Sequence, residues 1–181
     1  MKPSEFAALL ERFTRAAEAG DGQAFAACFT ADGVYHDYIY GDHAGRSAIA
    51  HMLEHLFLRD AGADYRWEMF DPVCHGDLGY AWSLSSFTSA VPEFAGRKVV
   101  IDGISRFELR DGLIAHYRES VNGGVAMAQL GVQPERLAKV CGKWAGLLHA
   151  QPDTKAFLAR PKGSRRAVPI QPGESRPETS T

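Results

Sequence analysis

One stretch of this sequence predicts a long β-hairpin around which the rest of the fold is organised: Lys98-Val-Val-Ile-Asp-Gly-Ile-Ser-Arg-Phe-Glu-Leu-Arg-Asp-Gly-Leu-Ile-Ala-His-Tyr-Arg-Glu-Ser120. The tripeptide Arg110-Asp-Gly112 is a turn signal, and its glycine can take the left-handed position of a bulged three-residue loop. The length of this loop decides which side chains share a face, and two registers are possible.

A two-residue loop would place Asp102 on the same face as Tyr117 and Glu119, whereas the bulged loop separates apolar from polar side chains. In the bulged register one face holds Val99, Ile101, Gly103, Ser105, Phe107, Ala115, Tyr117, Glu119 and Val121, and the other holds Asp102, Arg106, Glu108, His116, Arg118, Ser120 and Asn122. Because a sheet with one buried face selects its register by this separation, we predict the second register. Asp102 is then a surface charge near Arg118.

The bulged register places Glu119 on the apolar face. A buried carboxylate is costly unless it is paired, solvated in a cavity or protonated. A structural hydrogen bond to a neighbouring element would explain it, and so would a catalytic role. A second group of polar residues upstream favours the catalytic explanation.

The upstream group lies on a strand that begins at Asp32-Gly33, in which Tyr35, Asp37 and Ile39 alternate with His36, Tyr38 and Tyr40. Helical spacing predicts two helices before this strand, Ser4–Ala19 and Asp21–Phe29, and a helix after it from Gly45 to about Arg59.

The order helix, short helix, strand, helix and long strands resembles the nuclear-transport-factor-2-like superfamily, specifically its SnoaL-like and limonene-epoxide-hydrolase-like enzymes. The resemblance covers residues 4–130 and is carried by Ala19-Gly-Asp21, Phe29-Thr-Ala-Asp32, Gly45-Arg46, Arg110-Asp-Gly112 and Tyr117-Arg-Glu119. It implies an α+β fold: a cone-shaped barrel made of a strongly curved mixed sheet wrapped around the N-terminal helices, with a C-terminal helical extension.

Family residues carry over only in part. In limonene epoxide hydrolases a Tyr, an Asn two residues later and an Asp after a Trp-Arg pair hold the attacking water, and the matching positions here are Tyr35, Asp37 and Glu119. The Asp and Arg that protonate the epoxide in those enzymes match Ser83 and Ser85, so the acid is missing. Ketosteroid isomerases place a general-base Asp near Asp37 and an oxyanion-hole Tyr at Phe13, and the His of SnoaL-like dehydratases falls near Tyr65.

These patterns share an acid/base set, and we predict Tyr35, Asp37 and Glu119 as catalytic residues facing one cavity. Two carboxylates in one apolar pocket cannot both ionise freely, so one should titrate near neutrality while the other stays charged. The predicted substrate-binding residues are Phe13, Tyr65, Trp67, Ser83, Ser85, Tyr117 and Val121. Aromatic side chains at such positions also serve as plain core, so they indicate only an apolar or aromatic substrate.

No cofactor or metal is expected. His51-Met-Leu-Glu-His55 matches an inverted zinc-protease pattern, but the short helix offers no third ligand. Gly103 and Gly123-Gly124 do not form a dinucleotide-binding fingerprint. Three distant cysteines, Cys28, Cys74 and Cys141, predict neither a disulfide framework nor a zinc site.

Composition is that of an ordinary globular domain, with 45% hydrophobic and 23% charged residues in 181. A single domain is expected over residues 1–149, ending in an amphipathic helix from Pro134 to His149. Residues 150–181 are expected to form a Pro-rich basic flexible tail, since residues 155–181 hold six Lys/Arg against two Asp/Glu, leaving 14 against 20 in residues 1–154. No signal peptide or long apolar run is visible, so we expect a cytoplasmic protein that binds neither membrane nor nucleic acid.

The sequence therefore predicts a cofactor-independent small-molecule enzyme of lyase or isomerase type, acting by proton abstraction, dehydration or retro-aldol C–C cleavage on an aromatic or cyclic substrate. Epoxide-hydrolase-like hydrolysis and a non-catalytic ligand-binding or dimerisation module remain alternatives. A homodimer or higher homo-oligomer is also expected. If Ala81, Ser83 and Ser85 face the cavity, then Tyr80, Trp82 and Leu84 form an apolar outer surface.

Overall fold

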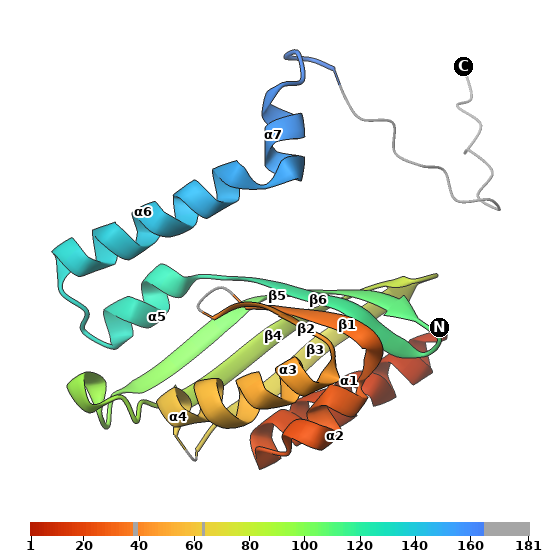
Figure 1. Cartoon of the computed structure of the whole chain (residues 1–181), viewed down its shortest axis with the longest axis horizontal. Coiled ribbons are helices and arrows are strands. Elements are labelled where there is room, and N and C mark those ends of the chain that lie inside the picture. The colour runs from red at the N-terminus through yellow and green to blue at the C-terminus, as the bar shows by residue number, and fades with distance from the viewer. Residues whose placement is uncertain (38–39, 63, 165–181) are drawn as a thin grey trace. The chain divides into compact units, whose positions relative to one another are not determined.

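The computed structural model describes residues 1–37, 40–62 and 64–164, and the chain divides into two compact units, Met1–Cys141 and Gly142–Thr181. The first unit contains a six-stranded sheet with helices on its concave side (Figure 1). Its strands are β1 (Phe29–Asp37), β2 (Gly41–Ala44), β3 (Arg66–His75), β4 (Leu78–Thr88), β5 (Lys98–Arg110) and β6 (Leu113–Val121). Its helices are α1 (Pro3–Ala19), α2 (Gly22–Ala27), α3 (Arg46–His51), the π-helix η1 (Met52–Phe57), α4 (Leu58–Ala61), the 3-10 turn η2 (Pro92–Phe94) and α5 (Gly123–Gln129).

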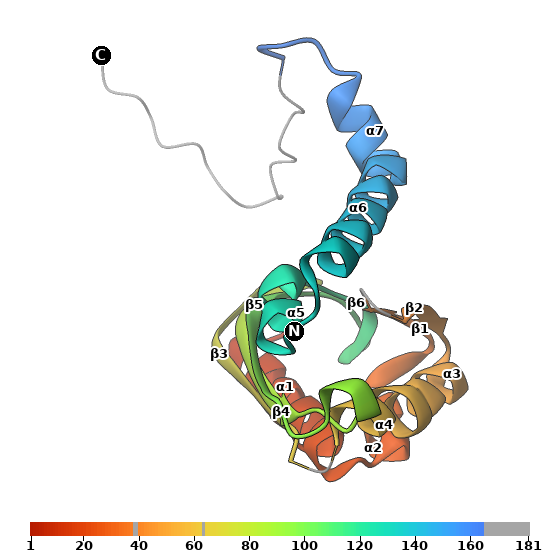
Figure 2. The ribbon, with the colours of Figure 1, turned by 90° about the vertical axis from the view of Figure 1, so that its left-hand side faces the viewer.

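The sheet has the strand order β2-β1-β6-β5-β4-β3, with β1 parallel to β6 and every other pair antiparallel. The predicted α+β class and the curved mixed sheet are confirmed. The sheet is not closed, because β2 and β3 are its two edges, and Figure 2 shows it curving around α1, α2 and α3 like a half-open cone.

The break between the first two helices is set by capping. Gly20 ends α1 in the left-handed conformation, with φ of 69°, and the Asp21 carboxylate accepts the backbone N–H of Ala24 at 2.8 Å to begin α2. The short helix is shorter than predicted, because Phe29 already belongs to β1 and pairs with Ile114 of β6. The strand therefore starts three residues before the predicted Asp32.

The predicted helix after Gly45 is a continuous helical run through Ala61 whose middle third is the π-helix η1. The Arg46 guanidinium anchors its start, since Nε and Nη2 both donate to the Phe29 carbonyl oxygen, at 2.8 and 2.7 Å. Glu54 in η1 accepts the Gly22 backbone N–H at 3.0 Å and so joins the run to the start of α2.

From His116 onward the β5–β6 hairpin has the predicted faces, but its loop differs from the prediction, and Ile114 is buried on the inner face where Ala115 was expected. Asp111 and Gly112, with φ of 53° and 78°, form a two-residue turn that pairs Arg110 with Leu113. The extra residue is a bulge inside β6, between the pairs Leu109–Ile114 and Glu108–His116. Beyond it, Phe107 pairs with Tyr117 and Ser105 with Glu119, while Asp102 is exposed.

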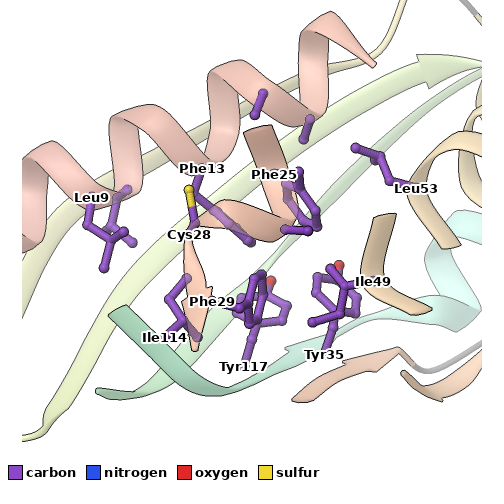
Figure 3. Packing of buried hydrophobic residues seen from close by; sticks show 14 of the residues in the cluster. Leu9, Phe13, Phe25, Cys28, Phe29, Tyr35, Ile49, Leu53, Ile114 and Tyr117 are labelled. Carbon is purple, nitrogen blue, oxygen red and sulfur yellow. The ribbon is translucent and has the colours of Figure 1, made fainter. Parts of the chain in front are cut away.

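The core lies between the concave face of the sheet and the apolar faces of α1, α2 and α3. Phe13 of α1 is fully buried and its ring lies 4.6 Å from that of Phe25 and 4.8 Å from that of Trp67. Figure 3 shows Phe13 and Phe25 descending from the helices toward Tyr117 and Tyr35, whose rings rise from neighbouring strands.

The side chains of strand β4 point to the two faces of the sheet as predicted. Ala81 and Ser83 are buried on the inner side, whereas Tyr80 and Trp82 are 38% and 43% exposed on the outer side.

After β6 the chain is helical. Asn122 caps α5 by accepting the Val125 N–H, and the Gln129 side chain bonds both the N–H and the C=O of Val100, where β5 extends beyond its pairing with β6. Helix α6 (Pro134–Ala150) confirms the predicted amphipathic helix, and α7 (Pro152–Leu158) lies within the segment expected to be a tail. No helix in the described part of the chain is long and apolar enough to cross a membrane.

Candidate active site

Glu119 lies on the inner face of β6 and is held by a short chain of hydroxyl groups. The Tyr117 hydroxyl donates to Glu119 Oε2 at 2.9 Å and lies 3.1 Å from Ser105 Oγ, with Tyr117 and Ser105 both fully buried. Burial raises the pKa of Glu119 from its usual 4.5 to about 7, the Asp37 charge adds to this, and the Tyr117 hydrogen bond opposes it. A carboxyl group in this state exchanges protons near neutral pH.

Asp37 reaches the same region from β1 because β1 and β6 are parallel and in register. Tyr35 is level with Tyr117 and His36 with Arg118, so the next step along the two strands brings Asp37 beside Glu119. Asp37 is 8% exposed and accepts the backbone N–H of Tyr40 at 2.8 Å. The two predicted carboxylates therefore lie on one face and interact electrostatically.

Tyr35, the third predicted catalytic residue, stacks on Tyr117 with ring centroids 4.7 Å apart and planes inclined by 27° (Figure 3). Desolvation raises the pKa of the Tyr35 hydroxyl well above its usual 10, and the charges of Glu119 and Asp37 act in the same direction. The hydroxyl therefore stays protonated and can act as a hydrogen-bond donor beside two carboxylates.

Tyr65 and Ser85 lie at the opposite wall of the cone. Tyr65 is 8% exposed, is hydrogen-bonded to Ser85, and packs edge-on against Phe57 with ring centroids 4.6 Å apart. Desolvation first and the Glu119 charge second raise the pKa of Tyr65 well above its usual 10, so Tyr65 also stays neutral. The electrostatic influence of Glu119 reaches both walls.

Most of the other predicted binding residues lie in the packed core under the carboxylates, which we call the floor, and Val121 lies at its margin. Trp67 Nε1 donates to Ser83 Oγ at 2.7 Å, and this pair, together with fully buried Phe13 and Tyr117, forms the packed floor beneath the carboxylates. Val121 is half-buried opposite Gly103. Phe13, Trp67 and Ser83 are thus core residues that support the site from below.

Two inner-face residues were not assigned a role from sequence. The position of Ser105 follows directly from the hairpin register, which places this residue opposite Glu119. His43 lies on the short strand β2, opposite Tyr35, and this pairing depends on a turn that hydrophobic spacing alone does not locate.

The His51–His55 pair does not gather into a metal centre. Their rings lie 4.7 Å apart, and the intervening Glu54 is engaged with the Gly22 N–H. Within the described ranges, no group of three or more His, Cys, Asp or Glu side chains could hold a metal ion.

A curved mixed sheet with helices on its concave side is the fold of the nuclear-transport-factor-2-like proteins. Within that class, the chain belongs to the family defined by the SnoaL-like domain, whose model matches residues 10–117. No curated protein matches its sequence.

Several solved structures share this fold at low sequence identity. TsrD from Streptomyces laurentii is 19% identical with a TM-score of 0.62, covering 74% of this chain and 99% of its own. An LEH-like epoxide hydrolase from M. tuberculosis is 17% identical with a TM-score of 0.58, covering 71% and 90%. IdmH from Streptomyces antibioticus, a candidate polyketide cyclase, is 19% identical with a TM-score of 0.58, covering 73% and 100%. At these identities the likeness establishes the fold alone.

Proposed function

We propose that this chain is a cofactor-independent enzyme that abstracts a proton from a small aromatic or cyclic substrate, with Glu119 as the general base. The observation that carries the proposal is the raised pKa of Glu119, about 7, on an inner face that also holds Asp37 and two neutral tyrosines. A base poised near the working pH gives the best combination of ionised fraction and basicity.

The chemistry follows from the positions of these groups. Ionised Glu119 takes a proton from the carbon next to a substrate carbonyl, and the C–H electron pair moves to form an enolate. The neutral Tyr35 hydroxyl is placed to donate a hydrogen bond to the enolate oxygen, which develops negative charge as the bond breaks.

The second half of the reaction decides its type. Glu119 can return the proton to another carbon, which is isomerisation. Alternatively, the enolate can expel a leaving group from the neighbouring carbon, which is a lyase reaction such as dehydration. A retro-aldol cleavage begins instead with removal of a hydroxyl proton, and the C–C electron pair becomes the enolate.

Asp37 has a supporting role in this scheme. Its carboxylate accepts the Tyr40 N–H, and its charge raises the pKa of Glu119. Asp37 therefore keeps Glu119 a stronger base than an isolated carboxylate would be.

The experiment follows solvent deuterium entering a set of enolisable aromatic and cyclic ketones by NMR. We expect Glu119→Gln to slow exchange by roughly 10²-fold or more and Asp37→Asn to slow it to a smaller extent. Asp102→Asn is the matched control, since Asp102 is exposed on the opposite face of the same hairpin. Exchange no faster than in buffer, or unchanged in Glu119→Gln, would reject proton abstraction.

Epoxide hydrolysis, the runner-up, uses a water held between Tyr35, Asp37 and Glu119. It also needs an acid to protonate the leaving oxygen, and Ser83, at the family's position for that group, hydrogen-bonds Trp67. Incorporation of ¹⁸O from water into a diol product would select hydrolysis over proton abstraction.

We also propose that the outer face of the sheet forms a homodimer interface. Trp82 is flanked by Phe70, with ring centroids 5.4 Å apart, and by its cross-strand partner Ile104, so an apolar row crosses three strands. Val73, Tyr80, Val100 and Ile104 are 61%, 38%, 45% and 49% exposed on these strands. An exposed apolar surface of this kind usually marks an interface.

A further inference from the structure

His43 lies on the inner face of the sheet at its β2 edge. It pairs directly with Tyr35 in the antiparallel β1–β2 ladder, and directly opposed residues project to the same side. The same face carries Asp37, two residues after Tyr35, and the charge of Asp37 acts on the imidazole. His43 is therefore a neighbour of the proposed site.

The Nε2 atom of His43 is buried and has no hydrogen-bond partner among the residues that the structure describes. Leaving a buried polar atom unpaired costs stability, because the atom has lost its hydrogen bonds to water. Such atoms are rare in native proteins, and a bound water or ligand is a common reason for them. Among the residues that the structure describes, His43 Nε2 is the one buried side-chain nitrogen or oxygen atom without a hydrogen-bond partner.

The other histidine of this hairpin shows the contrast. His36 projects from β1 to the outer face, where its Nδ1 lies against the Asp42 carboxylate of its cross-strand partner. One imidazole of the hairpin is thus paired on the outside, while the other is half-buried on the inside with its Nε2 atom covered and unpaired.

Desolvation favours the neutral form of His43. Desolvation, together with the charge on His51 when that ring is protonated, lowers the pKa of His43 below its usual 6.5 and outweighs the opposing carboxylates Asp37 and Asp42. A neutral imidazole carries one N–H and one lone pair, so it can donate a hydrogen bond without bringing a positive charge into an apolar site.

We propose that His43 is a ligand-binding residue of this site and that its Nε2–H donates a hydrogen bond to a carbonyl oxygen on an apolar ring system. Ionised Asp37 and Glu119 can only accept hydrogen bonds, so a carbonyl on this face depends on neutral donors, and His43 adds a second one to the Tyr35 hydroxyl. The inference rests on the proposed function to the extent that the inner face receives a small molecule, and it deepens that function by assigning a second hydrogen-bond donor to the substrate carbonyl.

The test compares two probes of the same shape, 2-acetylnaphthalene and 2-isopropenylnaphthalene, which differ by C=O against C=CH₂. Dissociation constants are measured by tryptophan fluorescence for the whole protein. Because one hydrogen bond contributes about 0.5–1.5 kcal/mol, we expect wild-type protein to prefer the ketone by roughly 2- to 10-fold. His43→Leu should abolish this preference, and His43→Gln, which keeps a donor, should retain part of it.

Controls separate binding from folding and from catalysis. His36→Gln, on the outer face of the same hairpin, should keep the preference. His43→Leu should melt at the same temperature as wild type or higher, because an unpaired polar atom has been removed. A purely structural role for His43 predicts instead a lower melting temperature and an unchanged ketone preference.

The inference is overturned if wild-type protein binds neither probe or does not distinguish them. It is also overturned if the His43→Leu variant distinguishes the two probes as well as wild-type protein does. Failure of the proposed function is visible separately. Wild-type protein that prefers the ketone but exchanges no deuterium would keep this inference and reject proton abstraction.

Discussion

Replacing Glu119 by Gln should stabilise the protein above neutral pH. The pKa of Glu119 is about 7 in the folded protein and about 4.5 when the chain is unfolded, so the folded state holds a proton that the unfolded state releases between these values. Stability contributed by this proton is fully present below pH 4.5 and is lost as the pH rises through 7. The gap of about 2.5 pH units, at about 1.36 kcal/mol each, amounts to about 3 kcal/mol.

Glutamine keeps the shape and an oxygen for the Tyr117 hydroxyl, but it cannot ionise. At pH 8.5 the variant should therefore be about 3 kcal/mol more stable than wild type, and at pH 4 the two should be nearly equal. For a chain of this size, the gain at high pH corresponds to roughly 6–12 °C in melting temperature.

The assay is urea and thermal unfolding of both proteins at half-unit steps from pH 4 to pH 8.5, with the difference plotted against pH. Carboxylates common to both proteins cancel in this difference. Asp102→Asn, an exposed outer-face carboxylate on the same hairpin, should stay within about 0.5 kcal/mol of wild type throughout. A Glu119→Gln difference that does not grow with pH, or a variant less stable at pH 8.5, would refute the buried-carboxylate argument.

Three further predictions follow from the same packing. Tyr117→Phe removes the hydroxyl that stabilises ionised Glu119, so the pKa of Glu119 should rise further above 7 in a carboxyl NMR titration; a fall would contradict the hydrogen bond's assigned effect. Trp82→Glu places a charge in the outer apolar row and should convert a dimer to a monomer by light scattering, whereas a wild-type protein that is already monomeric would remove the interface. Phe13→Ala should cost about 3–5 kcal/mol of stability, because the ring is fully buried, while exposed Leu148→Ala should cost less than about 0.5; equal losses would contradict the core assignment.

The hairpin faces were predictable because polar and apolar side chains separate in only one of the two registers. The position of the extra residue was not, since a bulge in the loop and a bulge within β6 put the same side chains on the same faces from His116 onward. Before the bulge the prediction was wrong: Ile114, and not Ala115, is the buried residue of the inner face. The structure selects the second arrangement through the positive φ angles of Asp111 and Gly112. The function-related consequence, Glu119 inside and Asp102 outside, is the same in both.

Sequence reasoning was weaker where a side chain's environment depends on distant elements. The predicted binding residues share a face by alternation, but alternation does not tell a ligand contact from a core contact. The Trp67–Ser83 hydrogen bond joins two strands and closes the floor of the cone, which a single-strand pattern does not reveal. His43 was missed for a related reason, because a four-residue edge strand has too few positions to show its inner face.

Polar groups on the inner face of the sheet differ in how well their hydrogen bonds are satisfied. At the floor, the polar atoms pair with one another: Trp67 with Ser83, and Tyr117 with Ser105. Nearer the β1–β2 edge, Asp37 and Glu119 face each other at an energetic cost, and His43 holds an unpaired nitrogen. Selection for stability alone would replace such groups by apolar or paired ones, so their concentration in one region points to a binding role there. Under the proposed function, the aromatic floor serves to exclude water beneath Glu119, and this desolvation is the largest contribution to its raised pKa.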